Sequence, residues 1–282
     1  MNIKGTTSIY GIFGHPVAHS LSPLMHNSAF RSLGLDCVYV AFDVAPENLK
    51  SAAIAIRSMN IKGINVTIPH KQRIMDFLDQ VSSDAEITGA VNTVKNEDGK
   101  LTGYNTDVGG FLRAIKEDLD FNPRGKAALI FGAGGAARAV LTAFCTNQIQ
   151  KITVVNRTAE KARGLVSEFQ GTFNNIDINA CSMSDVKGFE DTIAEVDIVV
   201  NSTSLGMEGK GKIDIPFQRI DKSAVVYDLV YKPHETGLIK DSKKAGLSAA
   251  GGIGMLLYQG AESFEIWTEM KAPVNEMKKV LL

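Results

Sequence analysis

AALIFGAGGAARAV, residues 127–140, carries the strongest structural signal in this chain. An apolar, strand-like run ends at Phe131, a glycine-rich turn follows, and an alanine-rich helical pattern begins at once. This order suits a dinucleotide pyrophosphate, because glycines let the backbone approach the phosphates and a helix N-terminus offers free N–H groups. Gly132, Gly134 and Ala137 fit the pattern G-x-G-x-x-G/A. An ordinary tight connection between a strand and a helix would also fit, so the rest of the chain has to supply the context.

The segments that follow alternate between helical and strand-like patterns. After the helical pattern at 135–145, further strand patterns are found at 151–156, 197–201, 224–230 and 246–250, with a helix predicted at 158–169. Such alternation predicts a doubly wound, Rossmann-type parallel sheet with the glycine turn after its first strand. The context therefore favours a nucleotide-binding role for that turn.

The first hundred residues predict another α/β domain, with an open and mainly parallel sheet. Strands are expected at 8–13, 37–44 and 63–69, and helices at 24–33, from Pro46 and at 71–78, with Ser22 as the N-cap of the first helix. Asp98-Gly99 predicts a hairpin. Two final helices, 255–270 and 272–282, are expected to return to this first domain. We therefore expect a first domain at 1–107 plus 252–282 and a nucleotide-binding domain at 108–251.

Composition and charge narrow the class of protein. The 282 residues suit two domains, and 44% hydrophobic with 22% charged residues is ordinary for a globular protein. With 30 basic against 31 acidic side chains, we expect neither nucleic acid nor a membrane surface as a partner. The chain shows no secretory leader or membrane span, and its three cysteines are widely spaced without C-x-x-C. These features predict a cytoplasmic protein without disulfides or a metal site.

The residues after the second Rossmann strand indicate which dinucleotide is bound. An NAD site usually has an acidic residue there, whereas this chain has Asn156, Arg157 and Thr158. A guanidinium can pair with a 2′-phosphate in a bidentate manner, so the pattern favours NADP. The alternative is that Arg157 is only a solvated residue at the start of the next helix.

Polar side chains gather at the strand ends of the first domain. They include Ser20, Ser22, Asn65, Thr67, Lys71, Asn92 and Asp107. Hydroxyl, amide, ammonium and carboxylate groups together suit a small polyhydroxylated acid. Each also has a structural alternative: serine and aspartate can cap helices, and asparagine can satisfy loop backbone. Lys71 opens a helical pattern, where its charge opposes the helix dipole, so a carboxylate partner is expected, and Asp107 is the candidate.

The chain resembles the shikimate dehydrogenase family in segments that follow one another through both domains. They are HSLSPLMHN (19–27), NVTIPHK (65–71), GAVNT (89–93), GYNTD (103–107), GAGGAAR (132–138), NRT (156–158), NSTSLGM (201–207), YDLVYKPHET (227–236) and GGIGMLLYQ (251–259). The resemblance implies reversible NADPH-dependent reduction of 3-dehydroshikimate to shikimate, on the pathway to chorismate and the aromatic amino acids. A shikimate or quinate dehydrogenase with relaxed use of substrate or NAD stays possible, as does a sensor that binds a dinucleotide without turnover.

The resemblance also implies roles for individual residues. Lys71 and Asp107 match the catalytic pair, and Ser20 and Ser22 match the serines that bind the substrate carboxylate. The ring hydroxyls and reacting oxygen are assigned to Asn65, Thr67, Asn92, Tyr231 and Gln259. The cofactor residues implied are Gly132, Ala133, Gly134, Gly135, Ala136, Asn156, Arg157, Thr158, Thr203, Leu229, Gly252 and Met255. Val108 departs from the glycine that is common in the family at this position. A monomer or homodimer is expected, with a small molecule as substrate and no metal.

Overall fold

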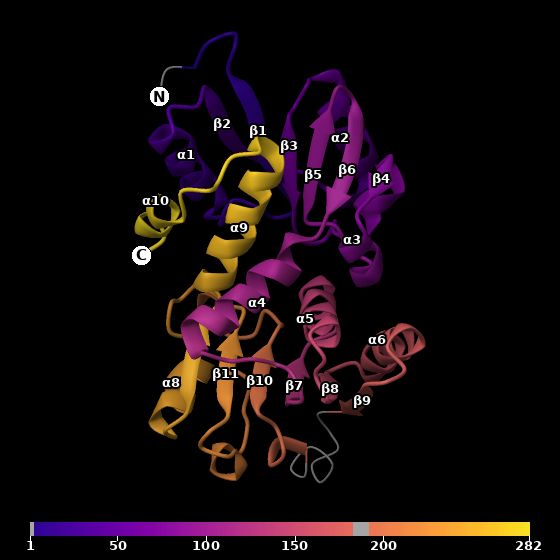
Figure 1. The fold of residues 1–282 in the computed structure, drawn as a ribbon, viewed down its shortest axis with the longest axis vertical. Helices are drawn as coiled ribbons and strands as arrows, with labels where there is room; N and C mark the ends of the chain where they lie inside the picture. Colours follow the sequence, from indigo (N-terminus) through magenta and orange to yellow (C-terminus); the bar gives the residue numbers. More distant parts are fainter. Residues whose placement is uncertain (1–2, 183–191) are drawn as a thin grey trace. The chain divides into compact units, whose positions relative to one another are not determined.

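The computed structural model describes residues 3–182 and 192–282, and the chain divides into two compact units. Unit 1 comprises Met1–Gly110 with Leu256–Leu282, and unit 2 comprises Phe111–Met255. Figure 1 shows the fold and labels most of the helices and strands. No helix in the described ranges is long and apolar enough to span a membrane.

The sheet of unit 1 is mixed, with six strands in the order β2-β1-β3-β5-β6-β4. The strands are β1 (Ser8–Gly14), β2 (Cys37–Asp43), β3 (Gly63–Val66), β4 (Gln80–Val81), β5 (Thr93–Glu97) and β6 (Lys100–Tyr104). β1 pairs in parallel with β2 and β3, and β4 with β6, whereas β5 runs antiparallel to β3 and β6. The predicted hairpin is confirmed between β5 and β6, where Asp98 and Gly99 both have positive φ, at 51° and 91°. Both central residues of a type I′ turn need that conformation.

The helices of this part of the chain differ from the prediction at two places. They are α1 (Ser22–Ser32), α2 (Leu49–Ser58), α3 (Ser83–Thr88), α4 (Thr106–Leu119), α9 (Ile253–Thr268) and α10 (Val274–Lys279), with 3-10 turns at Pro46–Asn48 and Arg73–Phe77. Ser22 is not the N-cap of α1 as predicted. It is the first helical residue, Leu21 is the N-cap, and the Oγ of Ser20 accepts the N–H of Ser22 at 3.2 Å.

The predicted helix at 71–78 is also wrong, since only a 3-10 turn forms. The carbonyl of Lys71 accepts the N–H of Val91 at 2.8 Å. Met75, whose N–H would bond to Lys71 in an α-helix, donates instead to Gln72 at 3.3 Å. The contact with Val91, two residues before β5, thus keeps Lys71 in a loop rather than on a helix.

The C-terminal helices return to unit 1, as predicted. The indole N–H of Trp267 in α9 donates to the carbonyl of Val94 in β5 at 2.9 Å. The hydroxyl of Ser28 in α1 donates to the carbonyl of Glu276 in α10 at 3.3 Å. The last residues of the chain therefore complete the fold of its first hundred.

Unit 2 confirms the predicted Rossmann architecture. Its six strands are all parallel in the order β12-β11-β10-β7-β8-β9, which is the 3-2-1-4-5-6 order read from the other edge. They are β7 (Ala127–Phe131), β8 (Lys151–Asn156), β9 (Asp177–Ser182), β10 (Ile198–Asn201), β11 (Val225–Asp228) and β12 (Ser248–Gly251). The helices are α5 (Gly135–Thr146), α6 (Ala159–Thr172) and α8 (Gly237–Lys244), with 3-10 turns at Met207–Gly209 and Phe217–Arg219. The strand order reverses beside β7, so the glycine turn lies at the position where such sheets bind nucleotides.

Candidate functional sites in the two units

The strongest chemical feature of unit 1 is an ion pair between Lys71 and Asp107. Lys71 Nζ lies 2.5 Å from Asp107 Oδ2, and the two side chains are only 16% and 7% exposed. Asp107 does not cap α4, because the side chain of Asn105 does so by accepting the N–H groups of Asp107 and Val108 at 3.1 and 3.4 Å. The Asp107 carboxylate is thereby left to face the ammonium. The first turn of α4 is helical at Val108, so this position does not require glycine.

Asn92 holds the second oxygen of that carboxylate. Its Oδ1 accepts the backbone N–H of Thr106 at 2.7 Å, which fixes the amide so that Nδ2 donates. Nδ2 then reaches Asp107 Oδ1 at 2.9 Å and Gln259 Oε1 at 3.3 Å. Both oxygens of Asp107 are therefore bound, one by an amide and the other by the ammonium. Asn92 therefore satisfies loop backbone, which is the structural alternative, and it also binds the Asp107 carboxylate.

Asn65 joins the same buried network from β3. Its Nδ2 donates to the carbonyl of Asn92 at 3.1 Å, to Thr93 Oγ1 at 3.1 Å and to Ser263 Oγ at 3.0 Å. Ser263, on α9, also contacts the hydroxyls of Thr93 and Thr106 at 2.8 and 3.1 Å. The sequence analysis missed Ser263, although it stands four residues after Gln259 and hence on the same face of a helix.

The remaining candidates of unit 1 lie at the ends of β1 and β3. Ser20 is half-buried and Ser22 is buried at the start of α1, a helix with no side-chain cap. Thr67 follows β3, and its carbonyl accepts the N–H of His70 in the turn that leads to Lys71. Unit 1 thus brings hydroxyls, amides, one ammonium and one carboxylate to neighbouring strand ends, whereas Tyr231 belongs to unit 2.

Glu262 is a second half-buried carboxyl near this network. It lies on α9, and a Cβ added to Gly109 in α4 would overlap its Oε2. Burial raises the pKa of Glu262 to about 7, with Asp84, Asp107 and Glu265 acting in the same direction. The folded chain therefore binds this proton more tightly than the unfolded chain, and it loses stability as the pH rises through 7.

We expect Glu262→Gln to remove that dependence on pH. A shift from 4.5 to about 7 corresponds to about 3 kcal/mol of unfolding free energy at pH 8. The variant should therefore exceed the wild type by up to about 3 kcal/mol at pH 8 and by much less at pH 5, as measured by urea unfolding. Glu47→Gln, at an exposed position of unit 1, is the control. An equal difference between Glu262→Gln and wild type at both pH values would contradict this account.

The glycine turn of unit 2 has the geometry of a phosphate cradle. Gly132 has φ +113°, and a Cβ there would lie 2.5 Å from Ser202 Oγ, so only glycine fits. Gly134 is exposed, and an added Cβ would meet nothing within 4 Å. It is the N-cap of α5 and provides no side-chain hydrogen bond to the helix. The N-terminus of α5 therefore has no side-chain cap and has open space at its N-cap residue, which suits a dinucleotide pyrophosphate.

The NRT segment at the end of β8 is exposed beside this turn. Asn156 is held by a hydrogen bond from its Nδ2 to the carbonyl of Thr158 at 2.9 Å. Thr158 is the N-cap of α6, but its side chain makes no capping bond. Arg157 is exposed just before the helix, and Lys161 is exposed in its first turn. The sequence analysis did not single out Lys161, which adds a second cation four residues after Arg157.

Thr203 and Leu229 lie on loops tied to one buried carboxyl, Asp228. Its Oδ1 accepts from Asn201 Nδ2 at 2.8 Å and from the N–H of Val230 at 3.0 Å. Asn201 Oδ1 in turn accepts the N–H and hydroxyl of Thr203 at 2.9 and 2.7 Å. Burial raises the pKa of Asp228, while its hydrogen-bond donors act in the opposite direction. Hydrogen bonds through Asn201 and Asp228 thus connect the loop after β10 with the loop after β11.

Gly252 and Met255, at the start of α9, lie against the same loops. A Cβ on Gly252 would overlap the carbonyl oxygen of Leu229, so the close approach requires glycine. The N–H of Met255 donates to the phenol of Tyr227 at 3.1 Å. The predicted cofactor residues are therefore found on loops at the carboxyl ends of β7, β8, β10 and β11 and at the start of α9.

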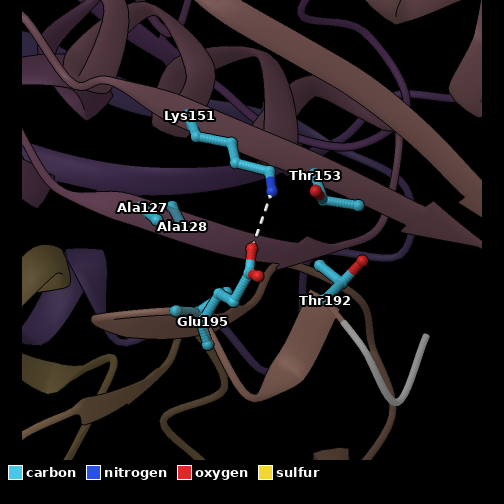
Figure 2. A pocket seen from close by; sticks show the side chains of 7 residues that line it. Ala127, Ala128, Lys151, Thr153, Thr192 and Glu195 are labelled. Atoms are coloured by element: carbon cyan, nitrogen blue, oxygen red, sulfur yellow. Dashed lines mark hydrogen bonds and ion pairs between the residues drawn. The ribbon is translucent and has the colours of Figure 1, made fainter. Parts of the chain in front are cut away.

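A small hollow of unit 2 lies at the opposite ends of its strands. It is lined by Ala127, Ala128, Lys151, Thr153, Thr192, Glu195 and Val196. Figure 2 shows the ion pair of Lys151 and Glu195, at 3.0 Å, among the lining side chains. Because ligands of such sheets bind at the carboxyl ends of the strands, this hollow is separate from the glycine turn.

A parallel sheet in the Rossmann order with this glycine turn defines a dinucleotide-binding unit, and the buried lysine–carboxylate pair of unit 1 offers groups suited to proton transfer. Three family models match: the shikimate dehydrogenase substrate binding domain at 12–94, shikimate / quinate 5-dehydrogenase at 114–208 and the shikimate 5′-dehydrogenase C-terminal domain at 252–282. The chain belongs to the shikimate dehydrogenase family.

Individual relatives match over the full length. The shikimate dehydrogenase (NADP(+)) of Desulforamulus reducens is 45% identical over 284 residues, covering 99% of this chain and 96% of the relative. A crystal structure of a shikimate dehydrogenase in complex with NADP+ has 41% identity and a TM-score of 0.90, covering 99% of this chain and 96% of that one. The shikimate 5-dehydrogenase of Listeria monocytogenes, in complex with shikimate and NAD, has 38% identity and a TM-score of 0.93, covering 100% and 99%.

Proposed function

We propose that Lys71 and Asp107 carry out the proton transfer of a shikimate dehydrogenase reaction. The chain catalyses the reversible, NADP-dependent interconversion of 3-dehydroshikimate and shikimate, on the pathway to chorismate and the aromatic amino acids. The observation that supports the assignment of the pair is the 2.5 Å contact between Lys71 Nζ and Asp107 Oδ2 at the polar strand ends of unit 1.

The residues of this pair have complementary tasks. NADPH, when bound, supplies the hydride, and the ketone oxygen of the substrate gains negative charge in the reduction. The Lys71 ammonium has three N–H donors, and one of them donates to Asp107. A second N–H can therefore donate to the ketone oxygen and transfer its proton to it. Asp107 orients the ammonium, and Asn92 keeps the carboxylate in place. In the oxidation direction the same pair accepts the proton of the substrate hydroxyl.

The other polar residues would bind the substrate. We assign the carboxylate to Ser20 and Ser22, and the hydroxyls to Asn65, Thr67, Asn92, Tyr231 and Gln259. Hydroxyl donors suit a carboxylate, since an ionised carboxylate only accepts hydrogen bonds. Amides both donate and accept, which suits hydroxyls.

The cofactor assignment rests on unit 2. We assign the pyrophosphate to residues 132–136, the 2′-phosphate to Asn156, Arg157 and Thr158 with Lys161 nearby, and the nicotinamide end to Thr203, Leu229, Gly252 and Met255. The free N-terminus of α5 and the close fit at Gly132 suit a dinucleotide. We further propose a substrate domain at 1–107 plus 252–282, an NADP domain at 108–251, and a monomer or homodimer in the cytoplasm.

The direct test is to mix the chain with shikimate and NADP+ and to follow absorbance of the reduced nicotinamide. We expect turnover with this pair of compounds and much lower kcat/KM with quinate or with NAD+. Comparable values with quinate or NAD+ would indicate a relaxed dehydrogenase. No turnover over a range of pH, with dinucleotide binding retained, would favour a non-catalytic sensor.

A further inference from the structure

The phenol of Tyr39 contacts Asn65, a candidate substrate-binding side chain of unit 1. Tyr39 belongs to β2 and is 1% exposed. Its hydroxyl donates to Asn65 Oδ1 at 2.7 Å. One buried phenol is thus the hydrogen-bond donor for a residue that is assigned to a ring hydroxyl of the substrate.

The direction of these hydrogen bonds follows from their partners. The carbonyl of Asn92 can only accept, so Asn65 must turn its Nδ2 toward it, at 3.1 Å. The Oδ1 of Asn65 then faces Tyr39, and the phenol must donate its single proton there. Tyr39 therefore fixes the orientation of the Asn65 amide, with Oδ1 as the acceptor and Nδ2 as the donor.

Tyr39 is itself held from several sides. The side chain of Asn27 in α1 bonds to both backbone groups of Tyr39, accepting its N–H at 2.9 Å and donating to its carbonyl at 2.8 Å. The ring of His26 stacks on the Tyr39 ring, with centroids 4.5 Å apart and an interplanar angle of 9°. Burial lowers the pKa of His26 to about 3, so the stacked imidazole is neutral at physiological pH. The position of the phenol is therefore set by the packing of α1 on β2.

We propose that Tyr39 is a positioning residue of the substrate site, which holds the Asn65 amide in the orientation that binds a ring hydroxyl of the substrate. This inference rests on the proposed function, because Asn65 is assigned to shikimate. Tyr39 touches neither the catalytic pair nor the cofactor residues in the contacts described above. Its effect should therefore fall on substrate binding and not on NADP.

Tyr39→Phe removes one oxygen atom and leaves the ring. We expect kcat/KM for shikimate to fall by about 10- to 100-fold, mainly through a higher KM, because Asn65 Oδ1 loses its buried donor. The KM for NADP+ should stay within about twofold of wild type, and so should kcat at saturating shikimate. The matched control is Tyr10→Phe, which removes a phenol oxygen from the same buried aromatic cluster, since both rings lie near Trp267. This control should leave the KM for shikimate unchanged.

A double-mutant cycle shows whether Tyr39 acts through Asn65. In an Asn65→Ala background, Tyr39→Phe should raise the KM for shikimate much less than it does alone. A wild-type KM in Tyr39→Phe would overturn the inference, as would equal effects of Tyr39→Phe and Tyr10→Phe or full additivity with Asn65→Ala. Failure of the proposed function looks different, since the wild-type chain would then not turn over shikimate.

Discussion

Lys71→Ala is expected to lower kcat for shikimate oxidation by about 10²- to 10⁴-fold, the usual range for a positioned proton-transfer group. The reason is geometric, since the Lys71 ammonium is the cation that contacts Asp107 in the buried network of unit 1. Steady-state kinetics with saturating NADP+ measures the effect. Lys100→Ala, at an exposed position of the same unit, should retain wild-type kcat.

Lys71→Arg separates proton transfer from charge. Arginine keeps a cation beside Asp107 but does not release a proton in proteins, so this variant should be nearly as slow as Lys71→Ala. If Lys71→Arg keeps most of the activity, the role of Lys71 is electrostatic. A near-normal kcat with only a raised KM in Lys71→Ala would make Lys71 a binding residue and would contradict the proposed role.

Arg157→Ala is expected to raise the KM for NADP+ by about 10- to 100-fold and to change the KM for NAD+ little. A charge-assisted pair between a guanidinium and a phosphate contributes about 1.5–3 kcal/mol, and only NADP has the 2′-phosphate. Arg157 is exposed at the end of β8, outside the core, so the variant should fold normally. Kinetics with both dinucleotides at fixed shikimate measures the two values.

The control for Arg157 comes from the same helix. Arg163 in α6 is exposed and pairs with Glu160 at 2.7 Å, so Arg163→Ala removes one positive charge at a site that is already neutralised. It should leave both KM values near wild type. Equal losses for NADP+ and NAD+ in Arg157→Ala would show that Arg157 does not recognise the phosphate.

Helices and strands could be predicted from the sequence where their local residue pattern agrees with the hydrogen bonds of the folded chain. The glycine turn at 132–135 is one example, because strand, turn and helix patterns follow one another within fourteen residues. The Asp98-Gly99 hairpin is another, since its turn chemistry is local. The helix predicted at 71–78 does not form, because the carbonyl of Lys71 accepts a hydrogen bond from a residue distant in sequence, the N–H of Val91. The two-residue strand β4 has too short a pattern to be recognised.

The candidate site, like the fold, could be predicted in part from the sequence. Asn65, Lys71, Asn92 and Asp107 could be named because polar groups at strand ends and family motifs both indicate them. Tyr39 and Ser263 were missed, since a tyrosine in a strand and a serine in an apolar helix look like ordinary core residues. Their roles depend on the network around Asn65, which joins β2, β3, β5 and α9. Such partners are separated by up to 224 positions, from Tyr39 to Ser263, and no local pattern connects them.

The split of unit 1 into two stretches of chain has a consequence for how the protein is made. Gln259 and Ser263 join the network of Asn65 and Asn92, yet they follow the whole of Phe111–Met255. Unit 2 is contiguous and can fold as it leaves the ribosome, whereas the residues before it must wait for α9. During that interval the Val94 carbonyl lacks its Trp267 partner. We expect the interval between emergence of unit 2 and docking of α9 to be when the nascent chain most needs a chaperone.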